Sequence, residues 1–143
     1  MFKYFLILTK DGRTRFARYY IDIKREEKVL IEAEIGRKCL QRGVDQCTFM
    51  EYKDHKIVYR RYASLYFVAG VDEDENDLSI YEFIQNIVEV LNSYFKNVTE
   101  MHILGNLDRV YMILDEMIMN GDIVEPRKKY VLATMKLIDE KSR

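Results

Sequence analysis

The sequence predicts an α+β fold in which one antiparallel sheet is covered by helices. Short runs rich in aromatic and β-branched residues are separated by tight turn signals, the pattern of antiparallel hairpins. A helical segment interrupts these runs once, and the pattern is helical from residue 77 onward. A length of 143 residues suits one domain. We therefore predict a single domain over residues 1–143, with five strands in the order ββαβββ followed by helices.

The first two strands are predicted to form a hairpin. Residues 4–8 are apolar on both faces, as expected for a strand that is covered on both sides. Asp11-Gly12 is a strong hairpin signal, because a two-residue turn of this kind needs positive φ at both positions. The return strand covers residues 14–20. Alternation along it places on one face Thr14, Phe16, Arg18 and Tyr20, and on the other Arg13, Arg15, Ala17 and Tyr19.

A helix is predicted over residues 25–42. Its apolar stripe recurs at every fourth position and is flanked by further apolar residues, the whole set being Leu30, Ile31, Ala33, Ile35, Cys39 and Leu40. Gly36 inside the helix costs about 1 kcal/mol relative to alanine. Gly43 suits the end of the helix.

Three more strands are predicted over residues 47–52, 56–61 and 64–71. Lys53-Asp54-His55 and Tyr62-Ala63 supply the connections between them. Connections this short favour a meander, in which consecutive strands are neighbours in the sheet.

The first helix after the strands begins at an acidic loop. Asn76 or Asp77 can cap it, and it is predicted to run to about residue 96. Asn97 suits the left-handed residue that ends it. Its core stripe is formed by Ile80, Ile84, Ile87, Leu91 and Tyr94.

The remaining segments are predicted to be helical. A short turn at residues 101–104 precedes a helix that begins after Asn106 and stops at Asn120-Gly121. Pro126 fits the first turn of a last helix over residues 127–138.

Composition and charge exclude several function classes. A net charge of −1 provides no basic surface, which argues against general nucleic-acid binding. The apolar start, residues 1–8, is too short to cross a bilayer and lacks a basic leader, so we interpret it as a core strand. Cys39 and Cys47 have no disulfide-framework spacing and are expected to be reduced, buried thiols of a cytosolic protein.

No pattern indicates catalysis, a metal or a cofactor. His55 is predicted in a turn and His102 between helices, and neither stands in a motif with cysteine or serine. The acidic run at residues 72–77 lacks the glycine and final glutamate of an EF-hand loop, so we interpret it as a solvated helix cap. Asn97-Val98-Thr99 matches a glycosylation acceptor, but nothing indicates a secretory compartment. We expect a protein that is not an enzyme.

Three motifs point to a family. They are Tyr-Arg-Arg-Tyr-Ala-Ser-Leu-Tyr-Phe at residues 59–67, Val-Glu-Val-Leu-Asn-Ser-Tyr-Phe at residues 88–95 and Leu-Asp-Glu-Met at residues 114–117. In this order they resemble the small (sigma) subunits of the AP-type clathrin-adaptor complexes, and the similarity runs essentially from end to end. The blocks that look most like the fourth adaptor class, with the first and second classes next, lie at residues 47–54, 80–84 and 120–125.

The resemblance implies a longin-like fold and a non-catalytic role in a four-chain vesicle coat that selects membrane-protein cargo. Its main partner would be the amino-terminal solenoid of one large adaptin, joined by a second large chain and a medium subunit. The chain would be cytoplasmic, and would reach trans-Golgi, endosomal or coated-vesicle membranes only through the complex. In isolation it would expose apolar surface that a partner normally covers.

The same resemblance implies a cargo site. In the sigma family an arginine after the first hairpin helps receive the acidic residue of an [Asp/Glu]-x-x-x-Leu-[Leu/Ile] sorting signal, and the matching residue is Arg15. Two adjacent pockets take the leucine-sized side chains. The residues that match the pocket positions are Ala63, Leu65, Val88, Asn97, Val98 and Ile103. Because Val88 lies beside the core stripe, we expect it to face sideways into a surface groove. Without the resemblance, the pocket positions are ordinary core or boundary residues and Arg15 is a solvated strand residue.

Two other interpretations stay open. A longin-type trafficking regulator outside an adaptor tetramer would share the fold, although we expect no fusion helix or heptad-bearing tail after residue 143. A small enzyme on this fold would reveal itself by stoichiometric zinc or by a cysteine of low pKa.

Overall fold

The computed structural model describes residues 2–41, 49–119, 122–123 and 128–141. It contains the predicted five-stranded antiparallel sheet, in the strand order β2-β1-β5-β4-β3. Consecutive strands β3, β4 and β5 form the predicted meander, and β1 pairs with β5 and β2. The strands are β1 (Phe2–Thr9), β2 (Thr14–Tyr19), β3 (Phe49–Tyr52), β4 (His55–Tyr62) and β5 (Leu65–Val71).

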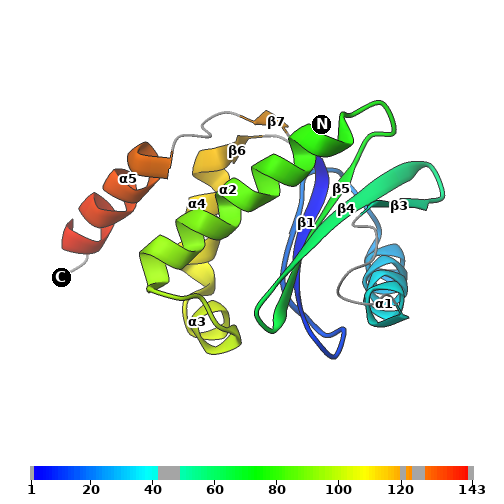
Figure 1. Cartoon of the computed structure of the whole chain (residues 1–143), viewed down its shortest axis with the longest axis horizontal. Coiled ribbons are helices and arrows are strands. Elements are labelled where there is room, and N and C mark those ends of the chain that lie inside the picture. Colours follow the sequence, from blue (N-terminus) through cyan, green and yellow to red (C-terminus); the bar gives the residue numbers. More distant parts are fainter. Residues whose placement is uncertain (1, 42–48, 120–121, 124–127, 142–143) are drawn as a thin grey trace.

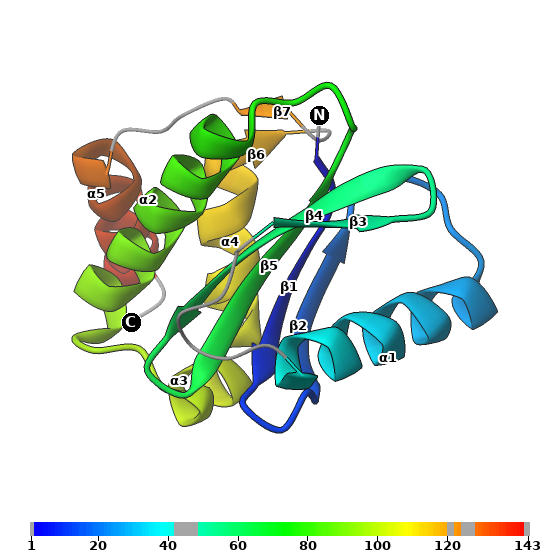
Figure 2. The same cartoon turned by 45° about the vertical axis from the view of Figure 1, so that its right-hand side comes forward.

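Helices cover both faces of the sheet (Figure 1). One face is covered by α1 (Arg25–Gln41), and the other by α2 (Asp77–Phe95) together with α4 (Leu107–Met117). The short helix α3 (Glu100–Gly105) lies near the end of the β1–β2 hairpin, and α5 (Lys128–Lys141) packs on α2 and α4 away from the sheet (Figure 2). The order of elements confirms the predicted α+β class.

The sheet separates two apolar clusters, and β1 contributes to both. Phe5 and Ile7 point to the cluster on the α2 side, whereas Leu6 and Leu8 point to the cluster on the α1 side. All four side chains are fully buried. A strand that is buried on both faces has a continuous apolar sequence, because its side chains point to the two faces in turn. The apolar run at residues 4–8 therefore predicted a covered strand.

Helix α1 buries a narrower stripe than predicted. Ile31, Ile35 and Cys39 are buried against the sheet, but Leu30 is 61% exposed and Ala33 is also exposed. The row at every fourth position faces the sheet, whereas Leu30 and Ala33 on its flanks face away from it. The side chain of Leu40 and residue Gly43 lie outside the described residues.

The turns differ in detail from the predictions. In the β1–β2 turn only Gly12 has positive φ (84°). The connection is longer than a two-residue turn: the Thr9 carbonyl accepts a backbone hydrogen bond from Gly12, and the Thr9 N–H donates one to the carbonyl of Arg13. The β3–β4 turn needs only two residues, with Lys53 left-handed, so His55 is the first residue of β4. Ala63 adopts the left-handed conformation between β4 and β5.

The helix boundaries follow local signals closely. The Asn76 side chain accepts a hydrogen bond from the Ser79 backbone at 2.9 Å and caps α2, one of the two predicted caps. Helix α4 ends at Met117, earlier than predicted, because Ile118 is already extended. The strand β6 (Ile118–Met119) then pairs with β7 (Asp122–Ile123), a small ribbon that the sequence pattern did not predict. Asn120-Gly121 and Pro126 lie outside the described residues.

Candidate functional site

Arg15 lies at an irregularity of the edge strand β2. The register pairs Ile7 with Phe16 but Leu8 with Thr14, which leaves Arg15 as the extra residue of a bulge. A bulge interrupts the alternation of side chains and re-aims the extra residue.

The bulge changes the contacts that Arg15 makes. Ala17 and Tyr19 pack against the cluster on the α1 side, as alternation predicts. Arg15 instead reaches α3, on the α2 side, where its Nε donates a hydrogen bond to Oε1 of Glu100 at 2.7 Å. The prediction that Arg15 shares the face of Ala17 and Tyr19 is therefore wrong, because a bulge depends on pairing with β1 and not on the local sequence.

The predicted pocket residues divide into two groups. Four of them are at most 2% exposed and belong to the cluster on the α2 side, namely Leu65, Val88, Val98 and Ile103. Ala63 and Asn97 are exposed turn residues with left-handed φ of 54° and 79°.

Val88 does not face a surface groove. It is only 1% exposed, so that part of the prediction is wrong for this structure. The helix α2 packs against the sheet and also against α4 and α5, so its buried arc extends beyond the predicted stripe to Val88 and Val90. The apolar half of the candidate site is closed.

Asn92, which sequence reasoning did not single out, ties the two exposed turns together. Its Oδ1 accepts the backbone N–H of Val98 at 2.9 Å, and its Nδ2 donates to the hydroxyl of Tyr62. Tyr62 precedes the turn at Ala63, and Val98 follows the turn at Asn97. The only sequence signal was the position of Asn92 inside one of the family motifs.

Glu100 is the second residue that the sequence did not indicate. It lies between Val98 and Ile103 in the chain, so its ion pair places the Arg15 guanidinium beside the segment that closes the apolar cluster. The structure therefore brings the predicted cationic residue and part of the predicted apolar pocket together.

The histidines have structural partners. His55, expected in a turn, is 4% exposed, and its Nε2 lies 2.6 Å from the Tyr4 hydroxyl. Its Nδ1 lies 3.1 Å from Oδ1 of Asp54, and this hydrogen bond lowers the pKa of the Asp54 carboxyl. Burial raises the pKa of the Tyr4 hydroxyl. His102 completes a capping box with Thr99 at the start of α3.

Cys39 and the acidic loop have structural surroundings in the described part of the chain. Cys39 is buried in α1, and Cys47 lies outside the described residues. In the acidic loop Asn76 caps α2, while Asp77 pairs with Lys56. The described ranges contain no group of three or more His, Cys, Asp or Glu side chains that could hold a metal ion. Nor does any helix within them combine the length and apolar character needed to cross a bilayer.

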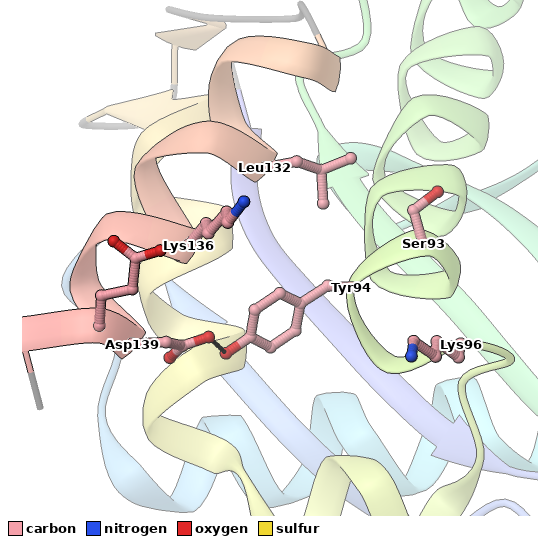
Figure 3. Close-up of a pocket in the computed structure, with 7 residues that line it drawn as sticks. Ser93, Tyr94, Lys96, Leu132, Lys136 and Asp139 are labelled. Carbon is pink, nitrogen blue, oxygen red and sulfur yellow. Dashed lines mark hydrogen bonds between the residues drawn. The ribbon is translucent and has the colours of Figure 1, made fainter. Parts of the chain in front are cut away.

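A hollow of about 480 Å³ lies between the end of α2 and helix α5 (Figure 3). The Tyr94 hydroxyl donates to Asp139 at 2.7 Å, and the same carboxylate pairs with Nε of Arg109 at 2.9 Å. This network fixes α5 against α2 and α4. The remaining lining residues carry charges of both signs or are small or apolar, and include Ser93, Lys96, Leu132, Lys136 and Glu140.

The five-stranded sheet and its helical layers form the longin-like fold of adaptor small chains, a class of vesicle-trafficking components that are not enzymes. The model of the clathrin adaptor complex small chain family matches residues 1–142, and the chain belongs to this family. The predictions of the family, of the longin-like fold and of a non-enzymatic role are confirmed.

Individual relatives also support the predicted order of adaptor classes. The chain is 47% identical to AP-4 complex subunit sigma-1 of Mus musculus over 142 residues, which cover 99% of both chains. It is 51% identical to AP-4 complex subunit sigma of Dictyostelium discoideum over 95% of both chains. AP-1 complex subunit sigma-2 of the same organism is 42% identical over 92% of this chain and 85% of that one.

The fold is similar to a chain in a homology model of the full-length AP-3 complex in a stretched open conformation. The TM-score is 0.80 at 25% sequence identity, covering 99% of this chain and 95% of that chain.

Proposed function

We propose that the chain is the small subunit of a four-chain AP-type adaptor complex of the AP-4 class, acting in intracellular vesicle transport. Near-full-length identity of 47–51% to AP-4 sigma chains, against 42% to an AP-1 sigma chain, supports this class. Its principal partner is the amino-terminal solenoid of one large adaptin, and a second large chain and a medium subunit complete the assembly. The subunit is cytoplasmic and contacts trans-Golgi, endosomal or coated-vesicle membranes only through the complex.

Exposed apolar side chains support a partner-covered surface. On α3 and α4, Met101 is 80% exposed and Leu104 is 46% exposed, with Leu107 and Tyr111 partly exposed beside them in the chain. On α1, Val29 is also 61% exposed. Large apolar residues grouped at the surface of a small domain favour a protein interface.

Co-expression with the large AP-4 chain tests this assignment. We expect a stable complex. The isolated subunit should bind a hydrophobic dye, and this binding should be lost when the complex forms. A monodisperse monomer that joins no large adaptin trunk would contradict the proposal.

We further propose that the subunit contributes to recognition of acidic dileucine signals. Arg15 receives the acidic residue, and the leucine side chains enter between Ala63, Leu65, Val88, Asn97, Val98 and Ile103. The observation that carries this proposal is the ion pair of Arg15, because it places a carboxylate-binding guanidinium next to the segment that holds Val98 and Ile103.

Entry of the leucines requires the closed cluster to open. Leu65 belongs to β5 and Val88 to α2, both long elements inside the core. Val98 and Ile103 instead belong to the short segment between α2 and α4, which is held by the bonds from Asn92 and Arg15. Local opening of a short connecting segment costs less free energy than opening of a core strand or a long helix. We therefore propose that movement of residues 97–105 admits the signal.

Peptide binding by the assembled complex tests the cargo role without disturbing the core. The peptides are an acidic dileucine sequence, a version with the acidic residue replaced by glutamine, and a version with both leucines replaced by alanine. Each leucine should contribute about 1.5–3 kcal/mol through apolar burial, and the ion pair about 0.2–1 kcal/mol. Arg15→Ser in the complex should remove the preference for the acidic residue alone. Equal binding of all three peptides, or an unchanged preference in Arg15→Ser, would leave this chain with an assembly role only.

A further inference from the structure

We propose that Glu100 is an internal competitor for the acidic residue of the sorting signal, so that it sets how strongly the subunit selects acidic signals. This inference rests on the dileucine-binding role proposed above and deepens it. Nε of Arg15 donates to Oε1 of Glu100 at 2.7 Å, the geometry that a signal carboxylate would adopt at the same guanidinium.

The pair is placed where exchange can occur. The side chains of Arg15 and Glu100 are 29% and 37% exposed, so an incoming carboxylate can reach the guanidinium without entering the core. The bulge in β2 directs Arg15 toward α3, and Glu100 is the first residue of that helix. The two residues are 85 positions apart in the sequence, so the pairing is produced by the tertiary fold.

Competition between the Glu100 carboxylate and the carboxylate of the signal limits the affinity that an acidic residue adds to the signal. If Glu100 stays in place, two carboxylates crowd one guanidinium and repel each other. If Glu100 leaves, the ion pair gained with the signal replaces the ion pair lost inside the chain. In both cases an acidic residue contributes less affinity, and less salt dependence, than it would at an unoccupied arginine.

The test measures peptide binding by the assembled four-chain complex that carries Glu100→Gln. The matched control is Asp115→Asn, because Asp115 pairs at 3.2 Å with Arg18 of the same strand, and its substitution changes the net charge equally. Each complex is titrated with the acidic dileucine peptide and with its glutamine counterpart at low and high salt.

We expect Glu100→Gln to tighten binding of the acidic peptide by about 1.5- to 5-fold, the range for a partly exposed ion pair. Its salt dependence should become steeper than that of the wild type. The glutamine peptide should bind as it does to the wild type, and Asp115→Asn should leave both affinities unchanged. Glu100→Ala is a second variant with the same expected result.

Three outcomes would overturn the inference while leaving the dileucine role intact. These are Arg15-dependent binding that Glu100→Gln leaves unchanged, an equal gain for both peptides, and an equal gain in Asp115→Asn. Failure of the wild-type complex to distinguish the acidic peptide through Arg15 would overturn both the cargo proposal and this inference.

Discussion

Gly36 of α1 lies directly against Gly12 of the β1–β2 turn: a Cβ atom added to Gly36 would come within 2.5 Å of the Gly12 carbonyl oxygen. A side chain there would meet rigid backbone, so helix and hairpin would have to move apart. The residue that costs the isolated helix about 1 kcal/mol therefore allows α1 to pack closely on the sheet.

Gly36→Ala should consequently destabilise the protein. The gain in helix propensity is about 1 kcal/mol, whereas overpacking against backbone costs about 1–3 kcal/mol, so we expect a net loss or at best no gain. Gly105→Ala in α3 is the control, since a Cβ atom there meets nothing within 4 Å and should be neutral or slightly stabilising. Urea denaturation measures both. Greater stability of Gly36→Ala than of wild type would show that the close approach is not a packing constraint.

Val88→Asp should unfold the chain or greatly weaken it, and not simply block a surface groove. Val88 is 1% exposed within the cluster on the α2 side, and an unpaired carboxylate there costs at least about 3 kcal/mol. Leu78→Asp is the matched control, because Leu78 is on the same helix but 61% exposed. It should change stability by less than about 0.5 kcal/mol. Thermal unfolding and soluble yield provide the measurement, and a stable Val88→Asp protein would mean that α2 can expose this face.

The fold was predictable where the signal is local. The recurrence of Ile31, Ile35 and Cys39 at every fourth position, the continuous apolar run in β1 and the Asn76 cap all depend on residues within a turn or a strand of each other. The same reasoning was wrong at Arg15, because a bulge is a property of two paired strands. It also missed the burial of His55, whose partner Tyr4 is 51 positions away.

The candidate site was predictable only in part, and for the same reason. Family resemblance indicated Arg15 and the apolar residues, but no local pattern indicates that Glu100 reaches Arg15 or that Asn92 holds Val98. Nor does a helical pattern alone show that Val88 is buried in the cluster on the α2 side. Those relationships depend on how elements distant in the sequence pack together.

Asn92→Ala should loosen the segment between α2 and α3. It removes the acceptor for the Val98 N–H and the donor to the Tyr62 hydroxyl, so we expect a loss of about 1–2 kcal/mol. Hydrogen exchange of the Val98 amide should accelerate. Asn92→Asp retains an oxygen acceptor at the same place and should restore most of the protection. Equal exchange in wild type and Asn92→Ala would show that other contacts hold this segment.

The contact between α2 and α5 should weaken in alkali because of Tyr94. Burial, followed by the hydrogen bond to Asp139, raises the pKa of Tyr94 from 10.0 to about 12. A folded-state pKa above the unfolded value stabilises the fold fully below pH 10, and this stabilisation is lost as the pH rises toward 12. Tyr94→Phe should therefore be less stable than wild type by about 0.5–1 kcal/mol at pH 8, and the difference should shrink above pH 10. Urea denaturation of both proteins between pH 8 and pH 12 measures this difference, and the other buried tyrosines cancel because both proteins retain them. A difference that stays constant over this range would assign the effect to packing of the hydroxyl and not to its proton.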